Sequence, residues 1–236
     1  MPDSPQQVPM KVIAHLYSEF PTKFGIPRQS GLAGTRARLV FEPEYRDANA
    51  LRGLEEFTHL WLIWQFSESV RDTWSPTVRP PRLGGNARMG VFATRSPFRP
   101  NAIGLSCVQL ERVDWQTPEG PVVWVLGADL MDGTPVFDLK PYLPYTDSHP
   151  EAAGGFTDQI VFSHLAVEIP EDLLARIPAD RREALRQVLA QDPRPSYQKD
   201  PERVYGFSFA GQEIRFCVAG ETLRVVDVTD ENRRQE

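Results

Sequence analysis

The 236-residue chain has few of the residues that usually build metal or disulfide sites. It contains only two cysteines, Cys107 and Cys217, and four histidines that are scattered along the sequence. Neither cysteine belongs to a spacing that is typical of a zinc ligand set or a redox pair. We therefore expect no metal site and reduced thiols, as in a cytoplasmic protein.

Long apolar segments and nucleotide-binding loops are also missing from the sequence. No apolar run reaches the length of a membrane-spanning helix, and the chain does not start with a charged and then apolar targeting segment. No G-x-G-x-x-G loop opens a helix and no P-loop occurs, which argues against a Rossmann nucleotide site. These absences predict a protein that neither inserts into a membrane nor binds a nucleotide in the Rossmann manner.

Acidic residues are missing from one long stretch, although the chain as a whole is acidic. The net charge is -6, so the composition does not indicate a basic nucleic-acid-binding protein. No Asp or Glu occurs between Asp72 and Glu111, whereas five arginines fall there: Arg79, Arg82, Arg88, Arg95 and Arg99. A local basic surface indicates a polyanionic partner. The simpler alternative is a solvated, arginine-rich loop.

The residues that are present predict a β-rich first part. Hydrophobic residues make up 41% of the chain, and 22 prolines disfavour a helical bundle. One short helix is expected at 47–57, and the segment 60–66 reads as a strand buried on both faces. The other expected strands are 10–16, 36–41, 91–93, 103–115, 122–127 and a broken strand within 129–148. Six or seven strands with one short helix predict a closed or nearly closed, mainly antiparallel β-barrel over 10–150.

The second part of the chain has a different pattern. After a Gly-rich linker at 151–158, helices are expected to begin at Pro170 and Pro178. The second helix carries an apolar stripe that is typical of packing. Three strands at 204–209, 213–218 and 223–228 are separated by glycine turns. We expect a small α+β domain over 160–236.

Four polar loop segments follow or interrupt apolar strands, and loops at one rim of a barrel converge. They are Pro27-Arg28-Gln29, Ser67-Glu68, Arg95 to Asn101, and Asp129 to Asp132. Prolines stiffen the third segment, and its guanidinium groups suit a carboxylate or a phosphate. The alternatives are that these arginines pair with structural carboxylates, and that Asp132-Gly133 is an ordinary turn.

Three long motifs carry a family resemblance. KFGIPRQSGL at 23–32, GVFATRSPFRPNAIGLS at 90–106 and DLMDGTPVFDLKPYLPYTDS at 129–148 closely resemble, in this order, the TsaA-like tRNA methyltransferases. The resemblance covers about 10–148 and continues in QDPRPSY at 191–197, which matches the second domain of the longer bacterial members. Ala102 is a departure, because the family usually has proline there.

The resemblance implies an activity, a cofactor and an assembly. Family members methylate the exocyclic amine of threonylcarbamoyladenosine, the modified base beside the tRNA anticodon, with S-adenosylmethionine bound to a β-barrel. They form homodimers with the cofactor near the subunit contact. The cofactor contacts that the resemblance implies are Pro27, Arg28, Gln29, Ser67, Glu68, Arg95, Leu105, Asp129, Leu130, Met131 and Asp132.

Candidate roles follow within that framework. Arg95 is expected to bind the carboxylate of the methionine moiety or to orient its loop. Glu68, Asp129 and Asp132 are expected to contact amino, ribose or adenine groups. The catalytic candidates are Arg95, Asp132, Tyr145 and Asp147. The target nitrogen must lose a proton, and Asp147, Tyr145 and water all stay open as its acceptor.

The expected partner is tRNA that carries threonylcarbamoyladenosine. The candidate RNA contacts are Arg79, Arg82, Arg88 and Arg99 for the phosphate backbone, and Arg194 and Tyr197 for a phosphate and a stacked base. The segment 191–197 has an alternative role, which is to lock the domain junction. The rival functions are a non-enzymatic RNA-binding barrel, a methyltransferase for a small acidic substrate and a protein-interaction scaffold.

Overall fold

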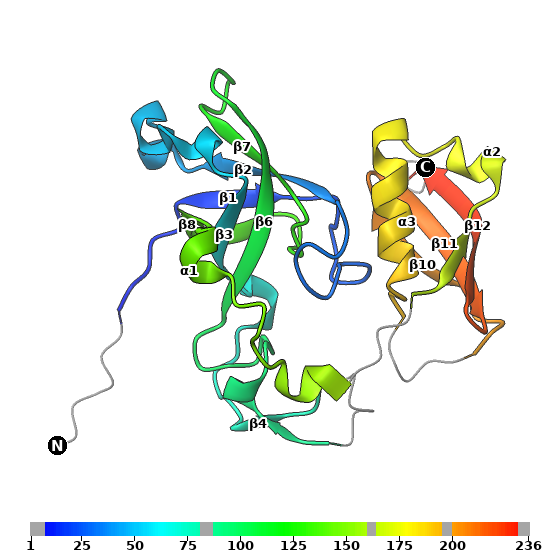
Figure 1. The fold of residues 1–236 in the computed structure, drawn as a ribbon. Coiled ribbons are helices and arrows are strands. Elements are labelled where there is room, and N and C mark those ends of the chain that lie inside the picture. Colours follow the sequence, from blue (N-terminus) through cyan, green and yellow to red (C-terminus); the bar gives the residue numbers. More distant parts are fainter. Residues whose placement is uncertain (1–7, 81–86, 160–163, 195–199, 231–236) are drawn as a thin grey trace.

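The first part of the chain forms a closed barrel of six strands (Figure 1). The computed structural model describes residues 8–80, 87–159, 164–194 and 200–230. The barrel strands are β1 (Ala14–Tyr17), β2 (Arg36–Phe41), β3 (His59–Gln65), β6 (Ile103–Asp114), β7 (Val122–Leu126) and β8 (Thr134–Pro141). Their order is β1-β2-β7-β6-β3-β8, and every neighbouring pair is antiparallel. The predicted antiparallel barrel is confirmed.

Alternation along the strands decides which side chains fill the barrel. In β3, Leu60, Leu62 and Trp64 are buried, whereas Trp61 and Ile63 on the other face are only half-buried. The expectation that this strand is buried on both faces is therefore wrong, because one face of an antiparallel barrel strand remains open to solvent. The first strand is also shorter than expected, since it begins at Ala14.

One tryptophan sets a size limit inside the barrel. Trp64 of β3 pairs with Gly104 of β6, and a Cβ atom on Gly104 would lie 2.2 Å from the indole ring. The indole Nε1 donates a hydrogen bond of 3.0 Å to Ser106 Oγ, and Ser106 is 1% exposed. Only glycine leaves room for the ring at position 104.

The expected helix at 47–57 is two separate 3₁₀ turns, η2 (Ala48–Leu51) and η3 (Leu54–Glu56), which follow η1 (Pro43–Tyr45). Gly53 lies between them with φ of +85° and interrupts the helical path. Leu51 and Leu54 are nevertheless both buried against the barrel core.

A long insertion joins β3 to β6. It contains η4 (Ser67–Ser69), a two-stranded ribbon of β4 (Thr77–Val78) and β5 (Met89–Gly90), and η6 (Val91–Ala93). The expected buried strand at 91–93 is wrong, because the segment is a 3₁₀ turn outside the barrel sheet. Val91 is 1% exposed, but Phe92 is 72% exposed.

The second part is an α+β unit, as expected. Its strands β10 (Tyr205–Phe209), β11 (Gln212–Ala219) and β12 (Thr222–Asp230) are antiparallel, and β9 (Ala166–Glu168) is parallel to β12. Its helices are α2 (Glu171–Leu174), η8 (Ala179–Arg181) and α3 (Arg182–Ala190), and α1 (Pro144–Asp147) and η7 (Gly155–Gln159) precede it. Within the described residues, no helix has the length and apolar character that crossing a membrane would require.

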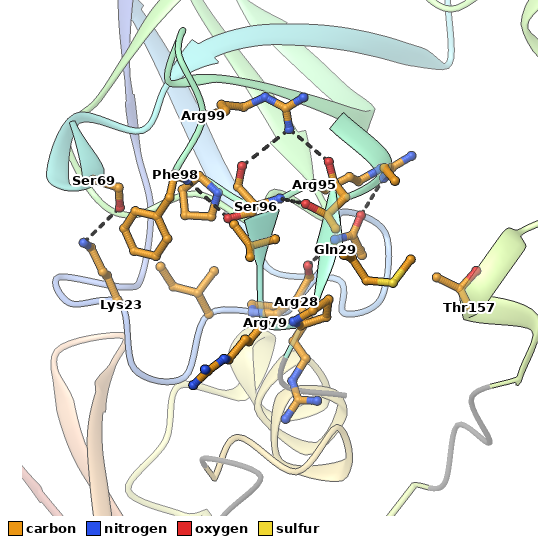
Figure 2. Close-up of a pocket in the computed structure, with 18 of the residues that line it drawn as sticks. Lys23, Arg28, Gln29, Ser69, Arg79, Arg95, Ser96, Phe98, Arg99 and Thr157 are labelled. Carbon is orange, nitrogen blue, oxygen red and sulfur yellow. Dashed lines mark hydrogen bonds between the residues drawn. The ribbon is translucent and has the colours of Figure 1, made fainter. Parts of the chain in front are cut away.

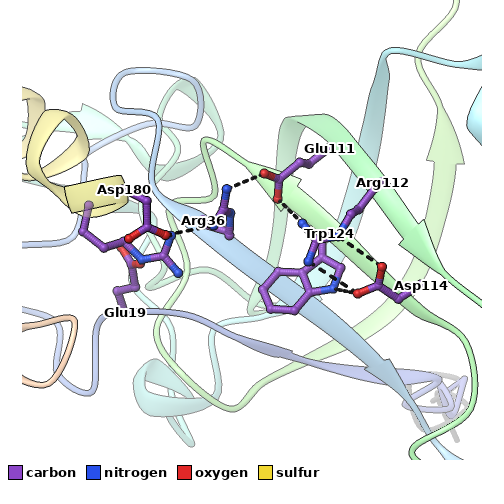
Figure 3. Close-up of polar contacts among 8 residues, drawn as sticks. Glu19, Arg36, Glu111, Arg112, Asp114, Trp124 and Asp180 are labelled. Carbon is purple, nitrogen blue, oxygen red and sulfur yellow. Dashed lines mark hydrogen bonds and ion pairs between the residues drawn. The ribbon is translucent and has the colours of Figure 1, made fainter. Parts of the chain in front are cut away.

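The two parts are joined by apolar packing and by charge. The core of the second part contains Phe20 and Ala33, which belong to the first part of the chain. Arg36 of β2 pairs with Glu111 (2.6 Å) and with Asp180 of η8 (3.2 Å), as Figure 3 shows. The junction therefore combines a shared core with charged pairs at its edge.

Candidate functional site

A cavity of about 1670 Å³ opens between the insertion, the loop at 23–32 and the second part of the chain. Its walls come from residues within the segments 23–32, 69–80, 89–99, 154–157 and 188–194. Figure 2 shows that the labelled side chains reach it from the loop at 23–32, from the insertion and from η7. Its size suits a nucleoside-sized ligand together with part of a larger substrate.

Two of the expected site segments meet on one wall of this cavity. Arg95 Nη1 donates a hydrogen bond to Gln29 Oε1 (Figure 2). Pro27 is buried and lies two residues before Gln29, so it limits the conformations of the loop. Arg95 is exposed, and its guanidinium retains donors for a ligand.

Asp129 supports this wall from the barrel side. Ser106 Oγ donates a hydrogen bond of 2.6 Å to Asp129 Oδ1, and the backbone of Ser30 in the loop acts to lower the pKa of this carboxylate. Burial raises the pKa of Asp129, while the Ser106 hydrogen bond and the charge of Arg95 oppose the increase. Asp129 therefore links the barrel interior to the loop that carries Gln29.

The loop at 95–101 is held together by its own contacts. Arg99 Nη1 donates to the carbonyl oxygens of Thr94 (3.0 Å) and Ser96 (3.4 Å). The Arg71 guanidinium lies 3.6 Å from the centroid of the Phe98 ring. The guanidinium of Arg99 is thus partly used inside the protein, whereas that of Arg95 is directed to the cavity.

Ser67 and Glu68 lie at the edge of the site. Both are exposed in η4, and the cavity is lined by the following residue, Ser69. Lys23 Nζ donates to the carbonyl oxygen of Glu68 (2.6 Å) and to Ser69 Oγ (3.3 Å). The lysine therefore ties the loop at 23–32 to η4.

Several expected cofactor residues lie away from this cavity. Leu105 is 56% exposed on the outer face of β6, and Leu130 is 1% exposed in the barrel core. Met131, half-buried, follows Leu130. Asp132 Oδ1 accepts a hydrogen bond from the Ser18 backbone N–H (2.9 Å) and lines a second cavity of about 400 Å³ at the junction.

The two candidate proton acceptors on α1 are also outside the cavity wall. Tyr145 is 87% exposed. Asp147 Oδ2 accepts hydrogen bonds from the Leu143 backbone N–H (3.0 Å) and from Trp61 Nε1 (2.9 Å), and these bonds lower its pKa. A carboxylate with a lowered pKa is a weaker base, so its contacts indicate a structural role.

The candidate RNA contacts differ in how available they are. Arg79 is exposed on the cavity wall, and Arg88 is exposed beside Thr77 Oγ1, which accepts at 3.5 Å. The Arg194 side chain is only 12% exposed and donates twice to Asp192, at 2.8 and 2.9 Å. Arg82 and Tyr197 lie outside the described residues.

The structure adds aromatic side chains that the sequence analysis missed. Trp74 is 53% exposed, Phe92 72% and Phe98 37%, and all three line the cavity. The Trp74 and Phe92 ring centroids are 6.1 Å apart, with 31° between the planes. An available signal was their position within the acid-free stretch, but Phe92 was assigned to a buried strand.

The part of the chain that the structure describes contains no cluster of metal-ligand side chains. There, no three His, Cys, Asp or Glu residues gather in a way that could hold an ion. Cys107 and Cys217 are both free thiols. The groups available are cations, amides, aromatic faces, the Asp192 carboxylate that is paired with Arg194, and the half-buried Asp129 behind the wall.

Known proteins similar to this chain agree with its fold and motifs. The tRNA-methyltransferase O N-terminal domain matches residues 15–148, and the TrmO C-terminal domain matches residues 157–231. A tRNA (adenine(37)-N6)-methyltransferase of Escherichia coli (strain K12) is 46% identical over 199 residues, which cover 80% of this chain and 83% of that protein. One of Eikenella corrodens with the same name is 48% identical over 162 residues, covering 69% of this chain and 91% of that protein.

A solved structure extends the similarity to both parts of the chain. The crystal structure of TrmO from Pseudomonas aeruginosa superposes with a TM-score of 0.77 at 34% identity, and the match covers 97% of this chain and 99% of that one. The resemblance inferred from the three motifs is thereby confirmed. The chain belongs to the tRNA-methyltransferase O family.

Proposed function

We propose that this chain methylates the exocyclic amine of threonylcarbamoyladenosine beside the anticodon of tRNA. Membership of its family makes it an S-adenosylmethionine-dependent tRNA methyltransferase; the modified base is the part that we add. The observation that carries the proposal is the wall formed by Arg95 and Gln29, which faces a cavity that also holds exposed aromatic rings and Arg79.

The residues on this wall fit the cofactor. The Arg95 guanidinium can bind the methionine carboxylate while Gln29 holds the guanidinium in place. The rings of Phe92 and Phe98 supply apolar faces for an adenine or a sulfonium. When bound, S-adenosylmethionine supplies an activated methyl group. The protein has to position the amine in line with it and to exclude water.

The described residues of the cavity wall offer no unpaired carboxylate to accept the proton of the target amine. Among the described lining residues the only acid is Asp192, which is paired with Arg194. Asp147 is held by Trp61 and has a lowered pKa. We therefore propose that water accepts the proton of the target amine. The charge of Arg95 and the rings of Phe92 and Phe98 would orient the reacting groups.

The substrate side of the cavity suits single-stranded RNA. Arg79 and Arg88 present guanidinium groups to phosphates, and the ring pair of Trp74 and Phe92 is open to stack on a base of the anticodon loop. A tRNA substrate also implies that the protein acts in the cytoplasm. The small acidic substrate of the rival hypothesis would leave this ring pair without a role.

A second copy of the chain would complete the assembly. The apolar side chains of Ile103 and Leu105 on β6 are 37% and 56% exposed. We propose that a homodimer covers part of this surface, which would bring Leu105 of one copy toward a cofactor site. Sedimentation equilibrium is expected to give twice the chain mass, and a monomer at all concentrations would contradict the dimer.

The test is methyl transfer to purified tRNA with and without threonylcarbamoylation, followed by mass spectrometry of the nucleosides. We expect a methyl group on threonylcarbamoyladenosine and none on unmodified tRNA. Methylation of both tRNAs would remove the requirement for the modification. Cofactor binding without transfer to either would favour a different substrate, and the absence of cofactor binding would favour a non-enzymatic RNA-binding barrel.

A further inference from the structure

The loop that carries Pro27, Arg28 and Gln29 is packed against the second part of the chain. Phe20 before the loop and Ala33 after it are 0% and 3% exposed within the core of the second part. Phe24 and Ile26 pack on the same core. At Gly25, with φ of +93°, a Cβ atom would lie 2.3 Å from the Phe207 ring of β10. The loop is therefore covalently part of the barrel but packs in the core of the second part.

Helix α3 holds the loop through hydrogen bonds to its backbone. Gln187 Oε1 accepts from the Gly34 N–H at 2.7 Å, and Gln191 Nε2 donates to the Leu32 carbonyl oxygen at 2.8 Å. A side-chain amide that bonds to backbone fixes the course of the chain, whatever side chains the loop carries. Gln187 lies in α3 and Gln191 is the residue that follows its last turn, four positions later, so both side chains are directed to the same side.

Arg28 makes the reverse kind of contact, in which a side chain of the loop donates to backbone carbonyl oxygens of the second part. Its Nη2 donates to the carbonyl oxygen of Asp192 at 3.2 Å and to that of Arg194 at 3.5 Å. These carbonyls follow the C-terminus of α3, where the helix dipole favours a cation. Asp192 has φ of +52° and is bridged by the Arg194 side chain, so the acceptors are themselves held in place.

Neighbouring residues of the loop bond to the two different parts of the chain. Arg28 points to the end of α3, and its neighbour Gln29 bonds to Arg95 on the opposite side (Figure 2). On the barrel side, Gly31 N–H donates to the Gly127 carbonyl oxygen at 2.8 Å. The direction of the Gln29 amide thus depends on contacts at both sides of the loop.

We propose that the second part of the chain is a positioning element for the cofactor loop. In this role α3 and the turn after it hold residues 28–34 in the pose that presents Gln29 to Arg95. The positioning residues are Arg28, Gln187 and Gln191. The inference rests on the proposed function in one respect, namely that this loop contacts S-adenosylmethionine. It replaces the expectation that Arg194 grips tRNA, because that guanidinium is bonded to Asp192.

The expected loss of cofactor affinity depends on the fraction of molecules in which the loop has the pose that binds the cofactor. When only a fraction of molecules has the competent pose, the apparent dissociation constant increases by the inverse of that fraction. Each amide hydrogen bond to backbone contributes a factor of roughly 2 to 10 to such an equilibrium. Loss of two should weaken cofactor binding about 10-fold. Saturating cofactor restores the pose, so kcat should change little.

The experiment uses the full chain with Gln187→Met and Gln191→Met combined. Methionine keeps the length of the side chain and removes the amide. Gln109→Met is the matched control, because Gln109 is exposed on β6. Calorimetry with S-adenosylmethionine and steady-state kinetics with modified tRNA are measured on each protein. We expect the Kd and KM for the cofactor to increase about 10-fold in the double variant only, with kcat and the KM for tRNA unchanged.

A second pair of variants distinguishes the loss of the Arg28 contact from a general loss of folding. Arg28→Lys keeps a donor for the carbonyl oxygens after α3, and Arg28→Met removes it. The lysine variant should keep most of the cofactor affinity and the methionine variant should lose it, with equal melting temperatures for the two proteins. Equal affinities for both would remove Arg28 from the positioning set.

The outcomes separate this inference from the function on which it rests. If the unsubstituted chain binds no S-adenosylmethionine, the proposed function is overturned and the inference with it. If the double variant binds the cofactor normally, the inference alone is overturned. A raised KM for tRNA at unchanged cofactor affinity would instead make the second part of the chain an RNA-binding accessory.

Discussion

At the scale of single residues, the arginines near the cavity differ in what their guanidinium groups already contact. Arg99 donates to carbonyl oxygens of its own loop, and Arg194 donates twice to Asp192. Arg95 contacts the Gln29 amide and remains exposed. All are the same residue type in sequence, so only the structure separates the exposed guanidinium of Arg95 from those that are already bonded to backbone or carboxylate oxygens.

Replacing Arg95 directly tests the proposal that the wall formed by Arg95 and Gln29 binds the cofactor. We expect Arg95→Ala to lower kcat/KM for S-adenosylmethionine roughly 100-fold, because a charge-assisted hydrogen bond to a carboxylate contributes about 1.5–3 kcal/mol. Titration calorimetry should show the loss in Kd. The fold should be retained, since Arg95 is exposed.

The matched control is Arg52→Ala, which removes an exposed arginine that lies between η2 and η3 and donates to Asn49 Oδ1. This variant should bind the cofactor normally. Wild-type methylation by Arg95→Ala would exclude Arg95 from the site.

At the scale of elements, the alternating strands could be predicted from sequence and the irregular turns could not. The range 36–41 corresponds to β2, and 103–115 differs from β6 by one residue, because alternation records one wet and one dry face. The apolar run at 91–93 has no sheet partner and forms η6. The three-residue β9 was missed because its pairing with β12 is long-range.

The candidate site shows the same division. The motifs indicated loop segments that converge, and Gln29 and Arg95 do meet, although Arg95 follows η6 and not the expected strand. They could not show that Asp132 faces another cavity, where Ser18 bonds to it. The packing of Phe20 and Ala33 into the second part could not be predicted either, because an apolar residue type does not indicate which of two cores the side chain joins.

The pairing of β3 with β6 gives a prediction about stability. Gly104→Ala places a Cβ atom 2.2 Å from the Trp64 ring, which is buried on all sides and cannot move away freely. We expect the free energy of unfolding to fall by about 1–3 kcal/mol, the usual cost of overpacking. Urea denaturation followed by tryptophan fluorescence measures it.

Gly90→Ala is the control for the loss of glycine itself. Gly90 has φ of -57° and no atom within 4 Å of a Cβ placed there. Its substitution should change the free energy of unfolding by less than about 0.5 kcal/mol. Equal losses in both variants would mean that Trp64 adapts and that the glycine at 104 is not required for packing.

At the scale of the whole molecule, charge is distributed unevenly. The chain carries -6 overall, yet the acid-free stretch places exposed Arg79 and Arg88 near the cavity. A polyanion would be attracted to this side and repelled by the acidic remainder, so local charge sets the direction of approach.

Salt dependence measures that attraction. Binding of tRNA should weaken as salt increases between about 50 and 200 mM, because phosphate contacts release counterions. Arg79→Gln should reduce the slope of log K against log salt by about 1, and it should leave cofactor affinity unchanged. An unaltered slope in this variant would show that the Arg79 guanidinium does not contact phosphate.

The junction of the two parts holds a buried acid that should make stability depend on pH. Glu19 is 10% exposed and forms an ion pair with Arg181, while Asp180 and Arg36 lie nearby (Figure 3). Burial raises the pKa of Glu19 to about 7, against the opposing charge of Arg181. Among the described residues, none donates a well-directed hydrogen bond to either carboxylate oxygen of Glu19.

A raised pKa in the folded state has a definite consequence for stability. In the unfolded chain a glutamate loses its proton near pH 4.5, whereas folded Glu19 keeps it until about pH 7. Between these values the folded state binds more protons than the unfolded state, so the contribution of Glu19 to stability decreases as pH increases. Above about pH 7 both states have lost the proton and the contribution is constant.

Glu19→Gln isolates this contribution from every other titrating group. The free energy of unfolding of the unsubstituted chain minus that of the variant should fall by about 1–3 kcal/mol between pH 4.5 and 8, since a shift of one pKa unit corresponds to about 1.4 kcal/mol. Denaturant titrations at steps of pH measure the difference. A difference that stays level would mean that Arg181 keeps Glu19 ionised at the junction, and one that increases with pH would mean that the ion pair outweighs burial.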